Sequence, residues 1–202
     1  MGLKSTGVIL AGGRNSRLPG KKKGFRRIGG RMIMERIHRE LSAVVDEIII
    51  VTNDPSAFAG FDSMIVSDID QSRCALSGLH AGIYYASYDR VFVTACDTPF
   101  VRRDIIRYIL SKADSKHDVI IPEGEGGLEA LLSVYTKACL PRIESNLKNK
   151  IFMIKKFYAK NRVKVVPAEE LKKIDPLMES FFNVNTPEDI VIANGMAEAK
   201  LK

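Results

Sequence analysis

The sequence predicts one α/β domain with a mostly parallel β-sheet and helices on both faces. Short runs rich in β-branched residues alternate with stretches of helical periodicity. These runs lack the polar alternation of a sheet with one solvated face, so both faces are expected to be covered. The 202 residues suffice for one well-filled domain and show no linker, repeat or low-complexity segment, so a single domain over 1–202 is expected.

The first half of the chain supplies most of the expected sheet. Strands are expected at 6–10, 47–52, 63–67 and 91–95, and helices at 32–44, 76–88 and 102–113. Parallel sheets bind ligands beyond the carboxyl ends of their strands. The residues that directly follow these strands are therefore the candidates for a functional site.

The second half is less regular. A strand over 118–122 leads into a glycine-rich turn, and another strand is expected at 163–166. The periodicity of 128–135 fits either a helix or a strand. A helix is expected over 137–148, and a last helix begins near Asn185, where an N-cap signal precedes a proline in the first turn.

Composition indicates a cytoplasmic protein without a membrane partner. With 46% hydrophobic and 27% charged residues the chain is ordinary globular material. Three cysteines without a Cys-x-x-Cys pair do not form a disulfide framework, which favours a reducing compartment. No apolar run approaches the ~18 residues of a membrane span, and no apolar signal-peptide core is seen at the N-terminus.

The net charge of +7 indicates polyanionic substrates rather than nucleic acid. Lysines and arginines are spread along the chain, and no zinc-finger spacing or aromatic-basic interleaving is present. Their densest cluster, at 21–27, lies in a glycine-rich loop. We therefore expect no nucleic-acid partner.

That loop follows the first strand and has the composition of a phosphate cradle. It reads Leu-Ala-Gly-Gly-Arg-Asn-Ser-Arg-Leu-Pro-Gly-Lys-Lys-Lys from Leu10. Glycines let backbone N–H groups approach a phosphate chain, and basic side chains neutralise its oxygens. Leu18 stands where a Walker loop has its second glycine, and no Ser or Thr follows the lysines. The dinucleotide fingerprint does not fit either, so the loop is of a third kind.

Asp97 lies just beyond the strand at 91–95, and Pro99 then turns the chain away. A carboxylate there suits Mg²⁺, which takes oxygen ligands and bridges substrate phosphates. The alternative is that Asp97 or Thr98 caps the next helix. Asp68 also follows a strand, but on its own sequence it is more typical of a turn residue.

Two asparagines precede the last helix. Alternation places Asn183 and Asn185 on one side of the chain and Val184 on the other. Two amides on one side can ligate a metal or hold phosphate oxygens without adding negative charge. The alternative is that Asn185 caps the helix, and the two roles are compatible.

Three motifs together resemble one family. The pattern Leu-Ala-Gly-Gly-x-x-x-Arg-x-x-Gly-x-x-Lys is similar to the opening of the molybdenum cofactor guanylyltransferases, the molybdopterin-guanine dinucleotide biosynthesis protein A type. Cys-Asp-Thr-Pro-Phe at 96–100 and Asn-Val-Asn-Thr-Pro at 183–187 match as well, so the resemblance covers residues 8–189. It implies a Rossmann-like three-layer domain of the nucleotide-diphospho-sugar transferase type, and it favours a strand at 128–135.

The resemblance also implies a reaction. GMP would pass from GTP to the phosphate of molybdopterin with Mg²⁺ as cofactor, and pyrophosphate would be released. The implied partners are GTP and molybdopterin, with cofactor-delivery proteins or molybdoenzymes as candidates, and a monomer or weak homo-oligomer is expected.

The resemblance assigns roles to individual residues. Asp97 would hold the metal and act in catalysis with Lys23 and Arg17. Asn183 and Asn185 would line the site beside the metal, and Glu129 stands where relatives carry an acidic residue or a histidine. GTP would be held by Leu10, Ala11, Gly12, Gly13, Lys23, Asp68, Leu76, Gly78 and Asp97.

Two departures from the family pattern bear on substrate identity. Cys74-Ala75 replace the usual Gly-Pro near the base, and Ala130 replaces a proline after Glu129. A sister enzyme that uses CTP, or one that acts on another phosphorylated acceptor, is the nearest alternative. The glycine pair at 12–13 favours the guanylyl branch. A non-catalytic GTP-binding or cofactor-binding protein and a basic nucleic-acid-binding module are more distant alternatives.

Overall fold

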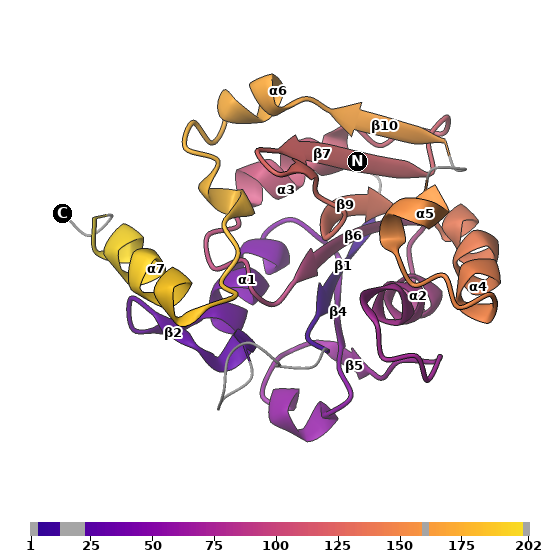
Figure 1. Cartoon of the computed structure of the whole chain (residues 1–202), viewed down its shortest axis with the longest axis horizontal. Helices are drawn as coiled ribbons and strands as arrows, with labels where there is room; N and C mark the ends of the chain where they lie inside the picture. The colour runs from indigo at the N-terminus through magenta and orange to yellow at the C-terminus, as the bar shows by residue number, and fades with distance from the viewer. Residues whose placement is uncertain (1–3, 13–22, 159–161, 200–202) are drawn as a thin grey trace.

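The computed structural model describes residues 4–12, 23–158 and 162–199 (Figure 1). Eight of its strands form one twisted sheet in the order β10-β7-β9-β6-β1-β4-β5, with β8 paired to β7. The strands of this sheet are β1 (Ser5–Leu10), β4 (Glu47–Val51), β5 (Met64–Val66), β6 (Arg90–Ala95), β7 (Val119–Gly124), β8 (Gly127–Leu128), β9 (Leu132–Tyr135) and β10 (Val163–Val166).

The sheet is mostly parallel, as predicted, with one reversed strand in its centre. The pairs β1–β4, β1–β6, β4–β5 and β7–β10 are parallel. β9 is antiparallel to both of its neighbours, β6 and β7. Segment 128–135 is therefore extended, as the resemblance favoured, although a short turn divides it into β8 and β9.

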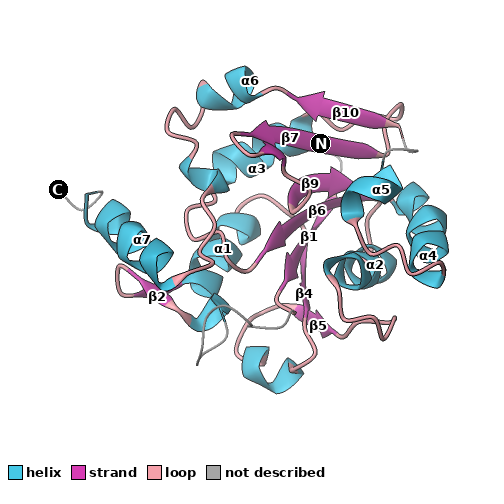
Figure 2. Cartoon of the chain, viewed as in Figure 1, coloured by secondary structure: helices cyan, strands magenta, loops and turns pink. Residues whose placement is uncertain are grey.

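Helices cover both faces of the sheet (Figure 2). The helices are α1 (Ile33–Ser42), α2 (Ala75–Tyr85), α3 (Arg103–Ser111), α4 (Leu140–Lys148), α5 (Ile154–Tyr158), α6 (Ala168–Lys172) and α7 (Pro187–Ala199). α1 and α3, with parts of α6 and α7, pack on one face, and α2, α4 and α5 pack on the other. No helix of the described ranges is long and apolar enough to cross a membrane.

Alternate residues of the central strands feed two separate cores. Val8 and Leu10 of β1 face α2, whereas Ile9 faces α1 and α3. In β6, Val91 and Val93 face α2, and Phe92 faces the opposite core. All of these side chains are buried, which explains why the strands read as continuous apolar runs in the sequence.

Several short elements have too few residues for a sequence pattern to predict them. They include α5, α6 and a hairpin formed by β2 (Arg27–Ile28) and β3 (Arg31–Met32). The hairpin turns at Gly29, whose φ of +54° favours glycine. The backbone N–H of Gly29 donates to Asn194 Oδ1 at 2.9 Å, which ties the hairpin to α7.

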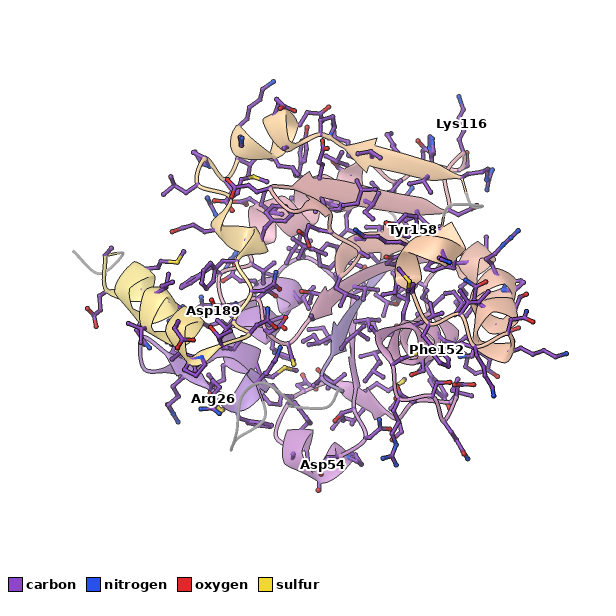
Figure 3. All side chains as sticks on the ribbon, viewed as in Figure 1. Arg26, Asp54, Lys116, Phe152, Tyr158 and Asp189 are labelled. Carbon is purple, nitrogen blue, oxygen red and sulfur yellow. The ribbon has the colours of Figure 1, made fainter. Side chains whose placement is uncertain are left out.

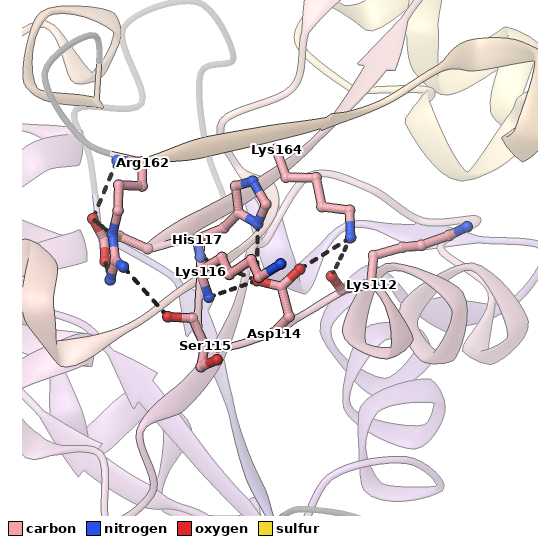
Figure 4. A network of polar contacts seen from close by, with 8 residues as sticks. Lys112, Asp114, Ser115, Lys116, His117, Arg162 and Lys164 are labelled. Atoms are coloured by element: carbon pink, nitrogen blue, oxygen red, sulfur yellow. Dashed lines mark hydrogen bonds and ion pairs between the residues drawn. The ribbon is translucent and has the colours of Figure 1, made fainter.

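A group of charged side chains fastens β10 to the loop that precedes β7 (Figure 4). Arg162 Nη2 lies 2.7 Å from Asp118 Oδ1, and Lys164 Nζ lies 3.2 Å from Asp114 Oδ2. Asp114 also accepts from His117 Nδ1 at 2.8 Å, and this bond is the main reason that the pKa of its carboxyl is held below its usual value. The network joins residues about 50 positions apart.

α2 packs closely on β1 through a glycine. A Cβ built on Gly82 would lie 2.5 Å from Val8 Cγ1 and 3.1 Å from its Cγ2. The helix can therefore approach the strand only because position 82 has no side chain. This contact fixes how closely α2 lies above the sheet, and the first turn of α2 borders the site described below.

We expect Gly82→Ala to lower the free energy of unfolding by about 1–3 kcal/mol, the usual penalty of overpacking. The clash with a branched core side chain outweighs the roughly 1 kcal/mol by which alanine favours a helix over glycine. Urea denaturation measures the difference. The control is Gly195→Ala in α7, where a Cβ meets nothing within 4 Å and stability should rise by about 0.5–1 kcal/mol. A Gly82→Ala protein as stable as the parent would contradict the packing argument.

Candidate active site

A pocket of about 350 Å³ opens at the carboxyl edge of the parallel strands. Residues that follow β1, β4, β5 and β6 line it, as expected for ligand sites in open α/β sheets. The strand register produces this arrangement, because Leu10 pairs with Val51 on one side and with Ala95 on the other. The polar lining includes Asn53, Asp68 and Asp97. Lys23, at the start of the described segment 23–158, also lines the pocket.

Lys23 joins Asp97 to the C-terminal segment. Its Nζ lies 3.1 Å from Asp97 Oδ2 and donates to Asn185 Oδ1 at 2.5 Å. Both partners of the ion pair are mostly shielded, with side-chain exposures of 22% and 16%. Three residues that the sequence spreads over more than 160 positions therefore meet at one point, as the motif interpretation expected.

Among the described residues, the second carboxylate oxygen of Asp97 has no hydrogen-bond partner. Oδ1 is buried, and no hydrogen bond reaches it from the residues that the structure describes. A buried carboxylate oxygen is costly to leave unpaired, so this atom is a candidate position for a bound cation or a ligand donor. The backbone holds the residue in place, because Val184 N–H donates to Asp97 O at 2.8 Å.

The helix-cap alternative for Asp97 is wrong. The next helix, α3, has Arg102 at its N-cap, five residues further along the chain. Thr98 is not the cap either, since its hydroxyl lies 3.1 Å from Ala95 O and donates to it. The Asp97 side chain is therefore available to the pocket.

Asn185 also does not cap the last helix. Thr186 Oγ1 accepts from Asp189 N–H at 3.2 Å, and Asp189 Oδ2 accepts from the backbone N–H groups of Thr186 and Asn185, each at 2.8 Å. Asp189 is labelled at the start of α7 in Figure 3. These bonds to backbone N–H groups lower the pKa of Asp189. Thr186 is the N-cap in this capping-box geometry, which leaves the Asn185 amide free to hold Lys23.

A polar group lies at the opposite end of the pocket, beyond β4 and β5. Asn53 Nδ2 donates to Asp68 Oδ2 at 2.9 Å. Gly78 of α2 faces this group, and a Cβ there would lie 3.6 Å from Asp68 Oδ1 and 3.4 Å from Leu10 Cδ2. Asn53 is a lining residue that the sequence interpretation missed. It follows a parallel strand just as Asp68 and Asp97 do, and that signal could have identified it.

Leu76 is the predicted nucleotide contact that the structure places elsewhere. Its side chain is fully buried in the core between α2 and the sheet, and it is absent from the pocket lining. The substituted Cys74 caps α2 instead, because its Sγ accepts from Ser77 N–H at 3.4 Å and Ser77 Oγ accepts from Cys74 N–H at 3.0 Å. Any contact of Leu76 with a ligand is thus limited to its backbone.

A second pocket of about 250 Å³ adjoins the first. The two share Ala95, Asp97 and Leu131. Asn183 lines only the second pocket, together with Glu129 and Phe181. Asp97 therefore stands on a wall that two cavities share. The first cavity is also lined by Gly12, which follows β1, and the second by Asn183.

Of the remaining predicted site residues, some line the first pocket and others lie outside the described residues. Ala11 and Gly12 line the first pocket, whereas Gly13 and Arg17 lie outside the described residues, so their roles stay predictions. Burial, helped by the Asp97 carboxylate, raises the pKa of the neighbouring Cys96 thiol to about 12, which disfavours the thiolate form.

Comparison with known proteins identifies the family. Residues 7–165 match the family described as the MobA-like NTP transferase domain. A molybdenum cofactor guanylyltransferase from Desulfosudis oleivorans is 37% identical over 194 residues, which are 96% of this chain and 96% of that protein. This chain belongs to the molybdenum cofactor guanylyltransferase family. A probable member from Pelotomaculum thermopropionicum is 35% identical over 97% of this chain and 95% of its own.

Solved structures of the family and beyond it share the fold. Molybdopterin-guanine dinucleotide biosynthesis protein A from Archaeoglobus fulgidus superposes with a TM-score of 0.85 at 23% identity, over 96% of this chain and 99% of its own. A 4-diphosphocytidyl-2C-methyl-D-erythritol synthase from Anaerococcus prevotii gives a TM-score of 0.72 at 17% identity, over 97% and 96%. The predicted nucleotidyltransferase fold and enzyme class are confirmed.

We expect Thr186→Ala to lower the free energy of unfolding by about 1 kcal/mol, because an N-cap acceptor is lost. Amide exchange in the first turn of α7 should rise at the same time. Thr186→Ser keeps the hydroxyl and serves as the control. If both variants unfold alike, Thr186 is not the cap and Asn185 is not freed in the way described.

Proposed function

We propose that this protein transfers GMP from GTP to the phosphate of molybdopterin and releases pyrophosphate. One observation carries the proposal: Asp97, which is paired with Lys23, stands where two pockets meet. A nucleotidyltransferase must hold donor and acceptor against the same phosphorus atom, and positioning of this kind supplies much of the rate enhancement. The first pocket would take the nucleotide and the second the acceptor.

The polar group at the far end of the first pocket supports a guanine base. Guanine presents a ring N–H and an exocyclic amino group on one edge, and a carboxylate accepts from both. Asp68 offers such a carboxylate, and Asn53 fixes its orientation through one of its oxygens. The corresponding edge of cytosine has one amino donor beside an acceptor nitrogen, so a carboxylate suits it less well. This favours GTP over the CTP alternative.

Asp97 fits a role as magnesium ligand. One of its oxygens is unpaired among the described residues, and the Asn185 amide oxygen lies beside the same lysine. The described part of the chain holds no group of three or more His, Cys, Asp or Glu side chains suited to a metal. This agrees with a cation held by one carboxylate and mainly by nucleotide oxygens, the usual manner for Mg²⁺. When bound, Mg²⁺ would supply charge neutralisation at the phosphates.

The chain's own residues would stabilise the leaving group. A phosphate oxygen of the acceptor attacks the α-phosphorus of GTP, the new P–O bond forms, and the bond to pyrophosphate breaks. The acceptor phosphate is already ionised near neutral pH, so it needs no general base. The Lys23 ammonium, preorganised by Asp97 and Asn185, would hold the charge that develops on pyrophosphate. Arg17 is proposed to assist from the glycine-rich loop, and Asn183 to orient the acceptor.

We further expect the protein to work in the cytoplasm as a monomer or weak homo-oligomer. Cofactor-delivery proteins or molybdoenzymes would receive the product.

Pyrophosphate release with Mg²⁺ and molybdopterin tests the function directly, with GTP, CTP, ATP and UTP compared. Turnover restricted to GTP is the expected result. A preference for CTP would place the chain in the cytidylyl branch. If none of the four nucleotides is turned over, the proposed reaction is wrong.

Asp97→Ala should lower turnover by roughly 100-fold or more, since the site loses its cation ligand and the partner of Lys23. The fold should remain, because the Asp97 side chain neither caps a helix nor fills the core. Steady-state kinetics and circular dichroism measure the two effects. Asp62→Ala removes an exposed carboxylate that lines neither pocket and should leave turnover unchanged. Near-parental activity of Asp97→Ala would remove the metal role.

A further inference from the structure

One carboxylate in the second pocket has no structural explanation. Glu129 is half-buried and lines the cavity that also contains Asp97. Among the described residues its carboxylate has no hydrogen-bond partner, and burial raises its pKa although the charge of Lys155 opposes this. Withdrawing a carboxylate from water without a partner is unfavourable for folding. The side chain is therefore a candidate for ligand recognition.

The backbone around Glu129 is fixed by hydrogen bonds. Its N–H donates to Pro122 O at 2.9 Å, and its carbonyl accepts from Ser133 Oγ at 2.6 Å and from Leu132 N–H at 3.1 Å. The fully buried Tyr135 donates its hydroxyl to Ala130 O at 2.6 Å. The turn between β8 and β9 is thus pinned on both sides. The backbone of Glu129 therefore keeps its position without a bound ligand, which is a property of a preorganised site.

A glycine makes room for this side chain. A Cβ on Gly124 would lie 3.0 Å from both Cγ and Oε1 of Glu129. A side chain at position 124 would crowd Glu129 and require it to shift. β7 therefore provides a cradle for Glu129 in addition to its pairing with β8.

The other walls of the pocket favour a flat heterocycle. Phe181 contributes an aromatic ring, Leu131 and Leu132 contribute aliphatic surface, and Asn183 contributes an amide. The Glu129 carboxylate beside these apolar side chains suits a planar ring that carries adjacent N–H donors, because the ring buries its faces and the carboxylate satisfies its edge.

We propose that Glu129 determines acceptor specificity by accepting hydrogen bonds from the 2-amino-4-oxopyrimidine edge of a pterin. One carboxylate oxygen accepts from the ring N–H and the other from the exocyclic amino group, while the phosphate of the same molecule reaches Asp97. The proposal rests on the proposed function, which makes the second pocket the acceptor site. It adds the residue that reads the ring.

A pair of small ligands tests this recognition without turnover. Pterin (2-amino-4-oxopteridine) carries the amino donor, and lumazine (2,4-dioxopteridine) has an oxygen in its place. Their dissociation constants are measured by the change in ligand fluorescence. The parent protein should bind pterin at least about 10-fold more tightly than lumazine, the effect of hydrogen bonds to a charged group.

Glu129→Gln should remove most of this preference, because an amide offers a donor where the ring also has one. Glu129→Asp keeps the charge one methylene shorter and should retain part of it. Glu125→Gln changes an exposed carboxylate in the neighbouring turn, outside both pocket linings, and should keep the full preference. Thermal unfolding of each variant shows that it is folded.

In turnover assays Glu129→Gln should raise KM for molybdopterin about 10-fold or more and leave KM for GTP unchanged. The proposal is overturned if the parent binds neither pteridine, or if Glu129→Gln keeps the parental preference for pterin. Both results are compatible with GMP transfer, so they leave the proposed function standing. A parent protein that prefers pterin through Glu129 but releases no pyrophosphate would instead overturn the proposed function alone.

Discussion

The parallel pairing of β1 with β4 and β6 is the constraint on which the site depends. In this register Leu10, Val51 and Ala95 end the three strands side by side. Gly12, Asn53 and Asp97 follow them and therefore border one pocket. Each strand buries side chains on both faces, so a slip of one residue would exchange the two cores and bring mismatched side chains into each. Core packing thus fixes the position of the polar groups as well as the fold.

Long-range contacts then complete the site. The ammonium group of Lys23 meets a carboxylate from the middle of the chain and an amide from near its end. The amide is available only because a neighbouring threonine caps α7. The C-terminal segment is further anchored by the backbone bond between Val184 and Asp97. The second pocket depends on the same segment, since Phe181 and Asn183 form part of its wall.

The sequence predicts the strands and helices that follow from local residue patterns. It predicts less well the strand directions and pocket residues that depend on contacts between distant parts of the chain. The strand before Asp97 reads correctly because its apolar run is buried on both faces, and the pattern places the carboxylate at its tip. The direction of β9 could not be predicted from periodicity, since parallel and antiparallel strands share the same repeat of two. Leu76 belongs to the core because helix α2 starts at Ala75 and turns it inward. Asn53 resembles an ordinary turn residue before Asp54 and Pro55, and in the sequence only its position after a parallel strand sets it apart. Its hydrogen bond to Asp68 then confirms its place in the pocket.

The charged network on β10 also bears on how the molecule meets its neighbours. β10 and β5 are the outermost strands of the sheet (Figure 1), and outermost strands expose backbone groups that can pair with another chain. β10 has lysine at position 164, and Arg162 precedes it, both held in ion pairs. β5 spans only Met64–Val66. A short strand at one edge and a charged strand at the other are poor templates for edge-to-edge aggregation. Neither edge is therefore expected to add a strand from another molecule.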